Sequence, residues 1–256
     1  VCLHHDAGVL GAVAPEKFIE TRLRTLKSIG TNAVRTSHNP QAPIFYELCD
    51  RLGLLVMDEA FDEWEFNKKK WVEGWNVGKP SMDGTADYFE EWSERDVADM
   101  VRRDRNHPSV FLWSIGNEVP EQGSASGRDY TRLMQNLVHE LDGTRPCTQG
   151  MDQETASIKA GNWQECDIPG FNYRLHVYHE GYRNSPKGIV LGTETASTIS
   201  SRGEYKFPVK EEHGTAYPDG QISSYDMESC IWSNLPDDDW MYQDKLPWVI
   251  GEFVWT

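Results

Sequence analysis

Short β-type runs alternate with amphipathic helical stretches along this chain of 256 residues. Eight runs are typical of strands, and most are separated by helical segments: 1–5, 32–38, 54–60, 110–118, 146–151, 170–173, 189–194 and 248–255. Repeated strand–helix units predict a parallel sheet covered by helices, and eight of them predict a closed (β/α)8 barrel. A doubly wound open sheet is the alternative, but no glycine-rich phosphate loop follows the first strand.

The helical stretches carry their own start and stop signals. The stretch 15–30 begins at Pro15 and ends at Gly30, with apolar residues at helical spacing between them. The stretch 44–52 stops at Gly53, and 89–103 and 129–141 are also helical. The last predicted strand reaches residue 255, so we expect one domain over residues 1–256, an α/β barrel that lacks its final helix.

Charge and apolar content exclude several classes of protein. The chain has 41 acidic and 25 basic side chains, a net charge of −16, which would repel a nucleic-acid backbone. No run approaches the ~18 apolar residues that a membrane span needs, and residues 1–6 do not resemble a signal peptide. Five scattered cysteines without a CxxC pair argue against a disulfide framework and a zinc ribbon.

Polar side chains gather where the predicted strands end, which in a barrel is the face that carries the active site. These clusters are His4-His5-Asp6, residues 35–39, Asp58-Glu59, Asn117-Glu118, Asn172-Tyr173, Glu194 and Glu252. Polar groups packed close to apolar strand residues destabilise a fold unless they are paired. Their convergence therefore predicts an enzyme, and the two long connections 61–88 and 197–246 are expected on the same face.

Two acids at opposite sides of the ring predict cleavage of a glycosidic bond. Glu118 ends the fourth strand and Glu194 the seventh, so one could protonate a leaving oxygen while the other attacks. Tryptophans in the long connections (Trp64, Trp71, Trp75, Trp232 and Trp240) favour a sugar, because pyranose rings pack on flat apolar faces. The alternative is that both acids are ordinary strand-end carboxylates paired with Arg35 or a lysine.

A metal site is a competing interpretation of the same face. One of the two adjacent histidines, His38 and Glu252 could together bind a divalent cation. A strand sends adjacent side chains to opposite faces, so only one of His4 and His5 can point into the mouth. We therefore predict no metal.

Four segments closely resemble the catalytic barrel of glycoside hydrolase family 2. They are TNAVRTSHNP (31–40), VMDEAFDEW (56–64), HPSVFLWSIGNE (107–118) and GTETAS (192–197), and they occur in the family's order. The family comprises β-galactosidases, β-glucuronidases and β-mannosidases. The stretch ETASTISSRG (194–203) is most similar to β-galactosidase-type members from gut Bacteroidetes.

The resemblance implies a role for each matching residue. It makes Glu118 the general acid/base and Glu194 the nucleophile. It implies that Arg35 keeps Glu194 ionised by lowering its pKa, and that the charge of Glu194 raises the pKa of Glu118. It implies that the sugar is bound by His5, Asp6, His38, Asn117, Tyr173 and Trp255, with no cofactor.

The implied function is that of a retaining exo-β-glycosidase acting on terminal β-D-galactosides through a covalent glycosyl-enzyme, with carboxyls ~5–5.5 Å apart. A β-glucuronidase of the same family and a catalytically weak, sugar-binding barrel fragment remain the alternatives. The resemblance also implies accessory β-sandwich domains in a larger parent chain, and it is compatible with a homo-oligomer. It favours a periplasmic or secreted bacterial protein over a cytoplasmic one.

Overall fold

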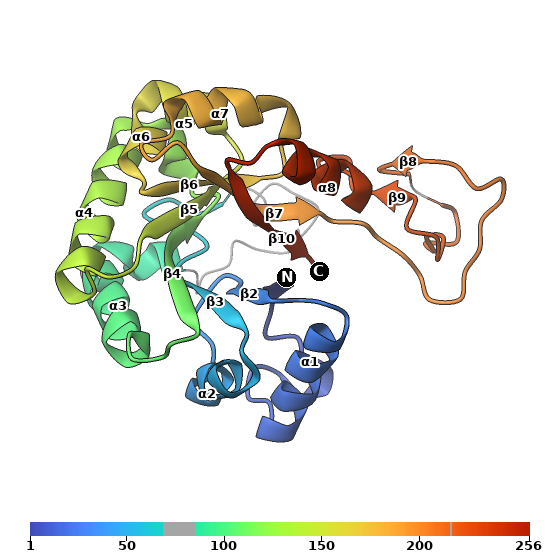
Figure 1. The fold of residues 1–256 in the computed structure, drawn as a ribbon, viewed down its shortest axis with the longest axis horizontal. Coiled ribbons are helices and arrows are strands. Elements are labelled where there is room, and N and C mark those ends of the chain that lie inside the picture. Colours follow the sequence, from blue (N-terminus) through green and yellow to red (C-terminus); the bar gives the residue numbers. More distant parts are fainter. Residues whose placement is uncertain (69–84, 216) are drawn as a thin grey trace.

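The computed structural model describes residues 1–68, 85–215 and 217–256 and contains the predicted barrel (Figure 1). Eight parallel strands form one sheet in the order β1-β2-β3-β4-β5-β6-β7-β10. Their bounds are Cys2–Leu3 (β1), Ala33–Thr36 (β2), Leu55–Glu59 (β3), Val110–Asn117 (β4), Cys147–Met151 (β5), Ile168–Asn172 (β6), Val190–Ala196 (β7) and Val249–Trp255 (β10). The eight-strand prediction is confirmed, because each of the eight runs overlaps one of these strands.

The first and last strands bring the two ends of the sheet together. Thr256 Oγ1 donates a hydrogen bond to the Cys2 carbonyl (2.9 Å), and the N- and C-termini lie side by side in Figure 1. The barrel is therefore nearly closed.

Helices cover the outside of the sheet (Figure 1). They are α1 (Glu16–Ser28), α2 (Pro43–Leu52), α3 (Phe89–Asp104), α4 (Ala125–Leu141), α5 (Glu154–Ala160), α6 (Asn162–Glu165), α7 (Tyr178–Asn184) and α8 (Pro236–Lys245), with 3-10 turns η1 (Gly8–Leu10), η3 (Thr85–Tyr88), η4 (Pro120–Gly123) and η5 (Leu175–Val177). Local sequence explains several of their ends. Pro43 occupies the first turn of α2, and Gly53 closes that helix with a left-handed φ of 68°, which glycine adopts without a Cβ clash. The Ser124 hydroxyl caps α4 by accepting from Gly127 N (3.1 Å).

The barrel interior is filled by apolar side chains from six strands. Cys2, Met57, Leu112, Ile168, Leu191 and Phe253 form one buried cluster. A larger cluster, which includes Val34, Val56 and Trp113, packs the outer side of the sheet against the helices. The alternation of Val56 and Met57 between these clusters shows which side of β3 faces inward, and it predicts that Glu59 points inward as well.

The two long connections differ from each other. In the first, Trp64 is buried in the outer cluster, with Nε1 donating to the Ile115 carbonyl (3.0 Å), so this tryptophan fills the core. Trp71 and Trp75 lie outside the described residues. The second connection forms a lobe that projects from the barrel, containing β8 (Glu212–His213) and β9 (Glu228–Ser229), and continues into α8 (Figure 1). None of the helices in the described residues is long and apolar enough to cross a membrane.

Candidate active site

Arg35 stands at the centre of a buried polar network at the C-terminal ends of the strands. Its Nη1 donates to Glu194 Oε1 (2.9 Å) and to the Thr193 carbonyl (2.7 Å). Its Nη2 donates to Asn117 Oδ1 (2.8 Å), and Nε and Nη2 both donate to Glu59 Oε2. The guanidinium is fully buried, and although burial lowers its pKa, Glu59 and Glu194 outweigh this and raise it. Arg35 is therefore a fixed cation that holds residues of four strands together.

The two predicted acids are joined through asparagine side chains. Asn172 Nδ2 donates to Glu118 Oε1 (3.0 Å) and to Asn117 Oδ1 (2.8 Å), and Asn117 Oδ1 in turn accepts from Arg35. The backbone register supports this, since Asn172 lies beside Glu194 in the β6–β7 ladder. Glu194 is 3% exposed, whereas Glu118 is half-buried. The structure thus brings Glu118, Glu194, Arg35 and Asn117 into one network.

The charge state of Glu194 differs from the expectation based on Arg35 alone. Burial, and next the charge of Glu118, raise the pKa of Glu194 to about 7, while Arg35 and His38 act in the opposite direction. The expected lowering by Arg35 is therefore present but is outweighed, because a buried carboxylate loses its hydration and faces a second acid. Near neutral pH Glu194 therefore carries a proton for part of the time.

His38 and Trp255 form one wall of the site. The two rings stack at 5.2 Å between centroids with an interplanar angle of 14°. His38 Nδ1 lies 2.6 Å from Glu59 Oε1, and Asn117 Nδ2 lies 3.2 Å from His38 Nε2. Burial would raise the pKa of Glu59, but Arg35 and the hydrogen bond from His38 hold it below its ordinary value. Glu59 therefore stays ionised and orients the guanidinium of Arg35 and the imidazole of His38.

The charges of both predicted acids act on the Tyr173 hydroxyl. Its backbone N donates to the Glu194 carbonyl (2.7 Å). Burial, followed by the charges of Glu194 and Glu118, raises the pKa of the Tyr173 hydroxyl far above its usual value. Hydrogen bonds from the side chains of Ser197 and Trp232 oppose this rise. The hydroxyl therefore keeps its proton and is available as a donor.

Backbone strain is concentrated at this edge of the barrel. In the described residues, every non-glycine residue with positive φ ends β7 or lies within two residues after β4, β6 or β7: Glu118 (43°), Tyr173 (65°), Arg174 (59°), Ala196 (60°) and Ser197 (61°). A left-handed conformation costs a residue with a Cβ roughly 1–2 kcal/mol. Such strain is typical of functional sites, where the surrounding structure fixes a side chain in one direction.

Two side chains that sequence reasoning missed complete the network. Asp62 Oδ1 accepts from Asn117 Nδ2 (2.9 Å) and lies 3.7 Å from His38 Nε2. Lys68, which is 4% exposed, forms an ion pair with Asp62. Both residues come from the connection after β3, where no local pattern distinguishes a site residue from a surface residue. Asn172 was visible as a polar strand end, but its sequence neighbours do not indicate what it binds.

His5 and Asp6 occupy the start of the β1–α1 connection. Asp6 Oδ1 pairs with Arg22 Nη2 of α1 (2.6 Å), and its side chain is 57% exposed. Both residues line a small cavity against α1 that also includes Phe18. The structure therefore turns Asp6 toward α1 rather than toward Arg35, and a contact of His5 or Asp6 with a sugar stays a prediction.

The remaining strand-end acids face the helix layer. Asp58 Oδ1 accepts from the Tyr46 hydroxyl (2.6 Å) on α2, and Glu252 Oε2 accepts from Thr195 Oγ1 (2.7 Å). In the described ranges, the one group of three side chains spaced to hold a metal ion is His139, Cys147 and Asp167, at the opposite end of β5. The alternative metal set of His4 or His5, His38 and Glu252 is therefore not brought together.

Known proteins resemble this chain over its full length. Residues 1–225 match the family described as "Glycosyl hydrolases family 2, TIM barrel domain". The β-galactosidase BoGH2A of Bacteroides ovatus is 34% identical over 100% of this chain and 33% of its own length. A putative β-glucuronidase of Formosa agariphila is 36% identical over 80% of this chain and 17% of its own length. The crystal structure of a β-glycosidase from Bacteroides vulgatus superposes with a TM-score of 0.80 at 32% identity, over 100% of this chain and 33% of that one. The chain thus spans a third or less of the length of these relatives.

Proposed function

Because the chain belongs to family 2 of the glycosyl hydrolases, we propose that it hydrolyses terminal β-D-galactosides as a retaining exo-β-glycosidase. One observation carries this proposal. Arg35 holds the buried Glu194 at 2.9 Å, and the same guanidinium is linked through Asn117 and Asn172 to Glu118. Two acids in different surroundings, joined by fixed hydrogen bonds, are what a double-displacement mechanism requires.

In the first step Glu194 attacks and Glu118 protonates. The Glu194 carboxylate forms a bond to the anomeric carbon as the glycosidic bond breaks, and Glu118 gives its proton to the departing oxygen. Arg35 favours the ionised form of Glu194, which is the form that attacks.

In the second step water replaces the leaving group. The ionised Glu118 removes a proton from water, the resulting hydroxide attacks the anomeric carbon, and the bond to Glu194 breaks. Both steps invert the anomeric centre, so the product retains the β configuration. We expect Asn117, through its Nδ2, and the protonated Tyr173 hydroxyl to donate hydrogen bonds to the sugar in both steps.

Charge supports a neutral galactoside over a glucuronide. Four carboxyl groups surround the site, namely Glu59, Asp62, Glu118 and Glu194. In the described part of the chain, Lys68 is ion-paired with Asp62, and Arg35 is ion-paired with Glu59 and Glu194. A uronate carboxylate would add a further negative charge, so the β-glucuronidase named among the relatives is the second candidate.

Azide rescue tests the two acids separately. Glu194→Ala should lose turnover by several orders of magnitude on an aryl β-galactoside, and azide should restore it as the α-galactosyl azide, because azide enters opposite the leaving group. Glu118→Ala with a 2,4-dinitrophenyl galactoside should give the β-galactosyl azide, because azide then attacks the glycosyl-enzyme. Glu252→Gln is the matched control and should keep most of the turnover, since Glu252 faces Thr195. Unchanged turnover in Glu194→Ala would refute the assignment.

Substrate class and stereochemistry need their own measurements. A chromogenic panel of β-galactoside, β-glucuronide and β-mannoside separates the two enzyme candidates, and NMR of the first-formed sugar reports its anomeric configuration. Release of the α anomer would contradict retention. Turnover of none of the three would favour a sugar-binding fragment instead.

A further inference from the structure

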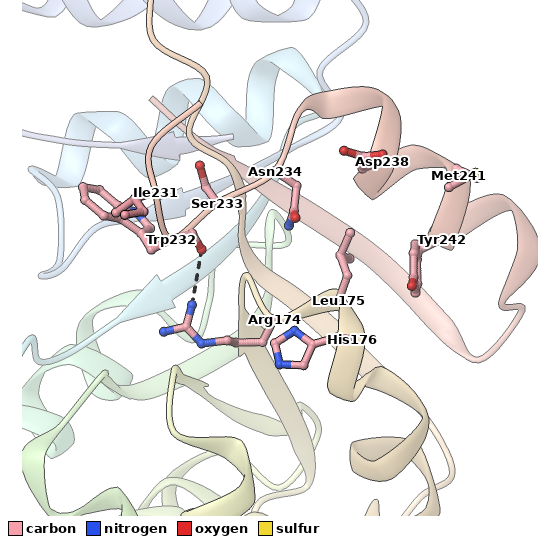
Figure 2. A pocket seen from close by; sticks show the side chains of 10 residues that line it. All are labelled: Arg174, Leu175, His176, Ile231, Trp232, Ser233, Asn234, Asp238, Met241 and Tyr242. Atoms are coloured by element: carbon pink, nitrogen blue, oxygen red, sulfur yellow. Dashed lines mark hydrogen bonds between the residues drawn. The ribbon is translucent and has the colours of Figure 1, made fainter. Parts of the chain in front are cut away.

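A second pocket of about 640 Å³ lies between the segment after β6 and the base of the lobe (Figure 2). Arg174, Leu175 and His176 line one side, and the opposite sides are lined by residues of segment 231–234 and of α8. Its volume falls within the range of ~300–1,000 Å³ typical of ligand sites. None of the residues that line it belongs to the network of Arg35.

The pocket borders the candidate site at Tyr173. Arg174 directly follows Tyr173, whose backbone N–H donates a hydrogen bond to the Glu194 carbonyl. Trp232 contacts both Tyr173 and Arg174. Its carbonyl accepts a hydrogen bond from Arg174 Nη1 (3.2 Å), and its side chain is hydrogen-bonded to the Tyr173 hydroxyl. The charges of Arg174 and Glu118 also act on the same carboxyl, that of Asp152 after β5. Since Glu118 protonates the leaving oxygen in the proposed mechanism, the group beyond that oxygen leads toward Arg174.

The lining combines an aromatic face with planar polar groups. Trp232 is 42% exposed and Met241 of α8 is 42% exposed, whereas Asn234 and Asp238 offer hydrogen-bonding groups. Within the described ranges, Arg174 makes one side-chain hydrogen bond, to the Trp232 carbonyl, and no ion pair. Its guanidinium therefore retains unused donors, held in place by a left-handed backbone (φ 59°). Sugars present both apolar C–H faces and vicinal hydroxyls, which match such a lining.

The surrounding charge favours a neutral ligand. Asp238 lines the pocket itself, and the carboxyl of Asp152 lies within range of the Arg174 charge. An anionic substituent would meet these acids as well as Arg174. Neutral hydroxyl groups can instead accept from Arg174 and donate to Asp238 without a net repulsion.

We propose that this pocket is a leaving-group subsite that binds the second and third sugar of a neutral oligosaccharide whose terminal β-galactose is cleaved. The inference rests on the proposed function, because it takes the position of Glu118 as that of the leaving group. With this subsite, oligosaccharides contact more of the protein than small aryl or alkyl galactosides do, and are therefore the better substrates.

Two substitutions in the pocket should separate substrates by length. Arg174→Ala removes the free donors, and Met241→Trp fills the space from α8. Each should lower kcat/KM for β-1,4-galactotriose about tenfold, the loss expected for one strong charge-assisted hydrogen bond. For 4-nitrophenyl β-galactoside, which has no second sugar, Met241→Trp should change kcat/KM less than twofold. Arg183→Ala, an exposed arginine on α7, is the matched control and should change neither value.

The outcomes distinguish the two proposals. If the parent protein does not hydrolyse 4-nitrophenyl β-galactoside, the proposed function fails. If it does, but Arg174→Ala and Met241→Trp leave the galactotriose value unchanged or reduce both substrates equally, only the subsite is refuted. Calorimetric titration of galactotriose into the Glu194→Ala protein gives a binding readout without turnover. Weaker binding in the Met241→Trp double variant supports the subsite, and equal or absent binding overturns it.

Discussion

Glu154 should make the protein less stable as the pH rises through the neutral range. It is the first residue of α5 and is 3% exposed, and its Oε1 has no hydrogen-bond partner within the described chain. Burial, opposed by a backbone hydrogen bond and Arg174 but aided by Asp152 and Glu118, raises its pKa from 4.5 to about 9. The folded protein therefore keeps a proton on Glu154 that the unfolded chain releases above pH 4.5.

The sign and size of the effect follow from this difference in pKa. Stability from Glu154 is greatest below pH 4.5 and falls as the pH rises, by about 1.4 kcal/mol per unit, until the folded pKa near 9 is reached. Between pH 5 and pH 8 the free energy of unfolding should fall by about 4 kcal/mol through this one group. At pH 7 the accumulated penalty is about 3 kcal/mol.

Replacing Glu154 by Gln removes the titration while keeping the size of the side chain. The free energy of unfolding, measured by urea denaturation with tryptophan fluorescence at pH 5, 6, 7 and 8, should be higher in Glu154→Gln than in the parent, and the gap should widen with pH. Glu140→Gln, an exposed glutamate on α4, is the matched control, because its carboxyl is hydrated in both states. Parallel curves for Glu154→Gln and the parent would refute the reasoning.

Two further predictions concern the network of Arg35. In a plot of kcat/KM against pH, the acid limb should have its midpoint near pH 7, because burial and Glu118 raise the pKa of Glu194 to about 7. A midpoint below pH 5 would show that the effect of Arg35 on this pKa dominates instead. Arg35→Met should lower the free energy of unfolding by about 3–5 kcal/mol and abolish measurable turnover, because it leaves Glu59 and Glu194 buried without their cation. Urea denaturation measures the first effect and a steady-state assay the second. Full retention of stability would contradict the prediction.

The strands and the principal acids could be predicted because their signals are local. A strand shows itself by a short apolar run, and a polar residue at its end is visible in the same few residues. Glu118, Glu194, Arg35 and Asn117 each end or follow such a run, and parallel strands bring those ends to one edge. The family motifs were local for the same reason.

Side-chain direction and burial could not be predicted, because they depend on segments far apart in the chain. Asp58 and Glu59 are adjacent, yet one bonds to Tyr46 of α2 and the other to Arg35 inside the barrel. Irregular register between β6 and β7 decides which residue lies beside Glu194. A regular two-residue alternation does not specify such shifts.

The sequence by itself determined the barrel, its order of strands and the identity of the acids at its mouth, because hydrophobic periodicity and strand-end polarity are properties of neighbouring residues. Only the tertiary structure decided that Glu194 has a pKa raised to about 7, that Asp6 turns to Arg22, and that Arg174 and Trp232 enclose a second pocket. Each of these depends on which distant groups exclude water from a side chain or supply its charge. Desolvation and Coulomb interactions act through space, so their outcome is fixed only when the chain has folded.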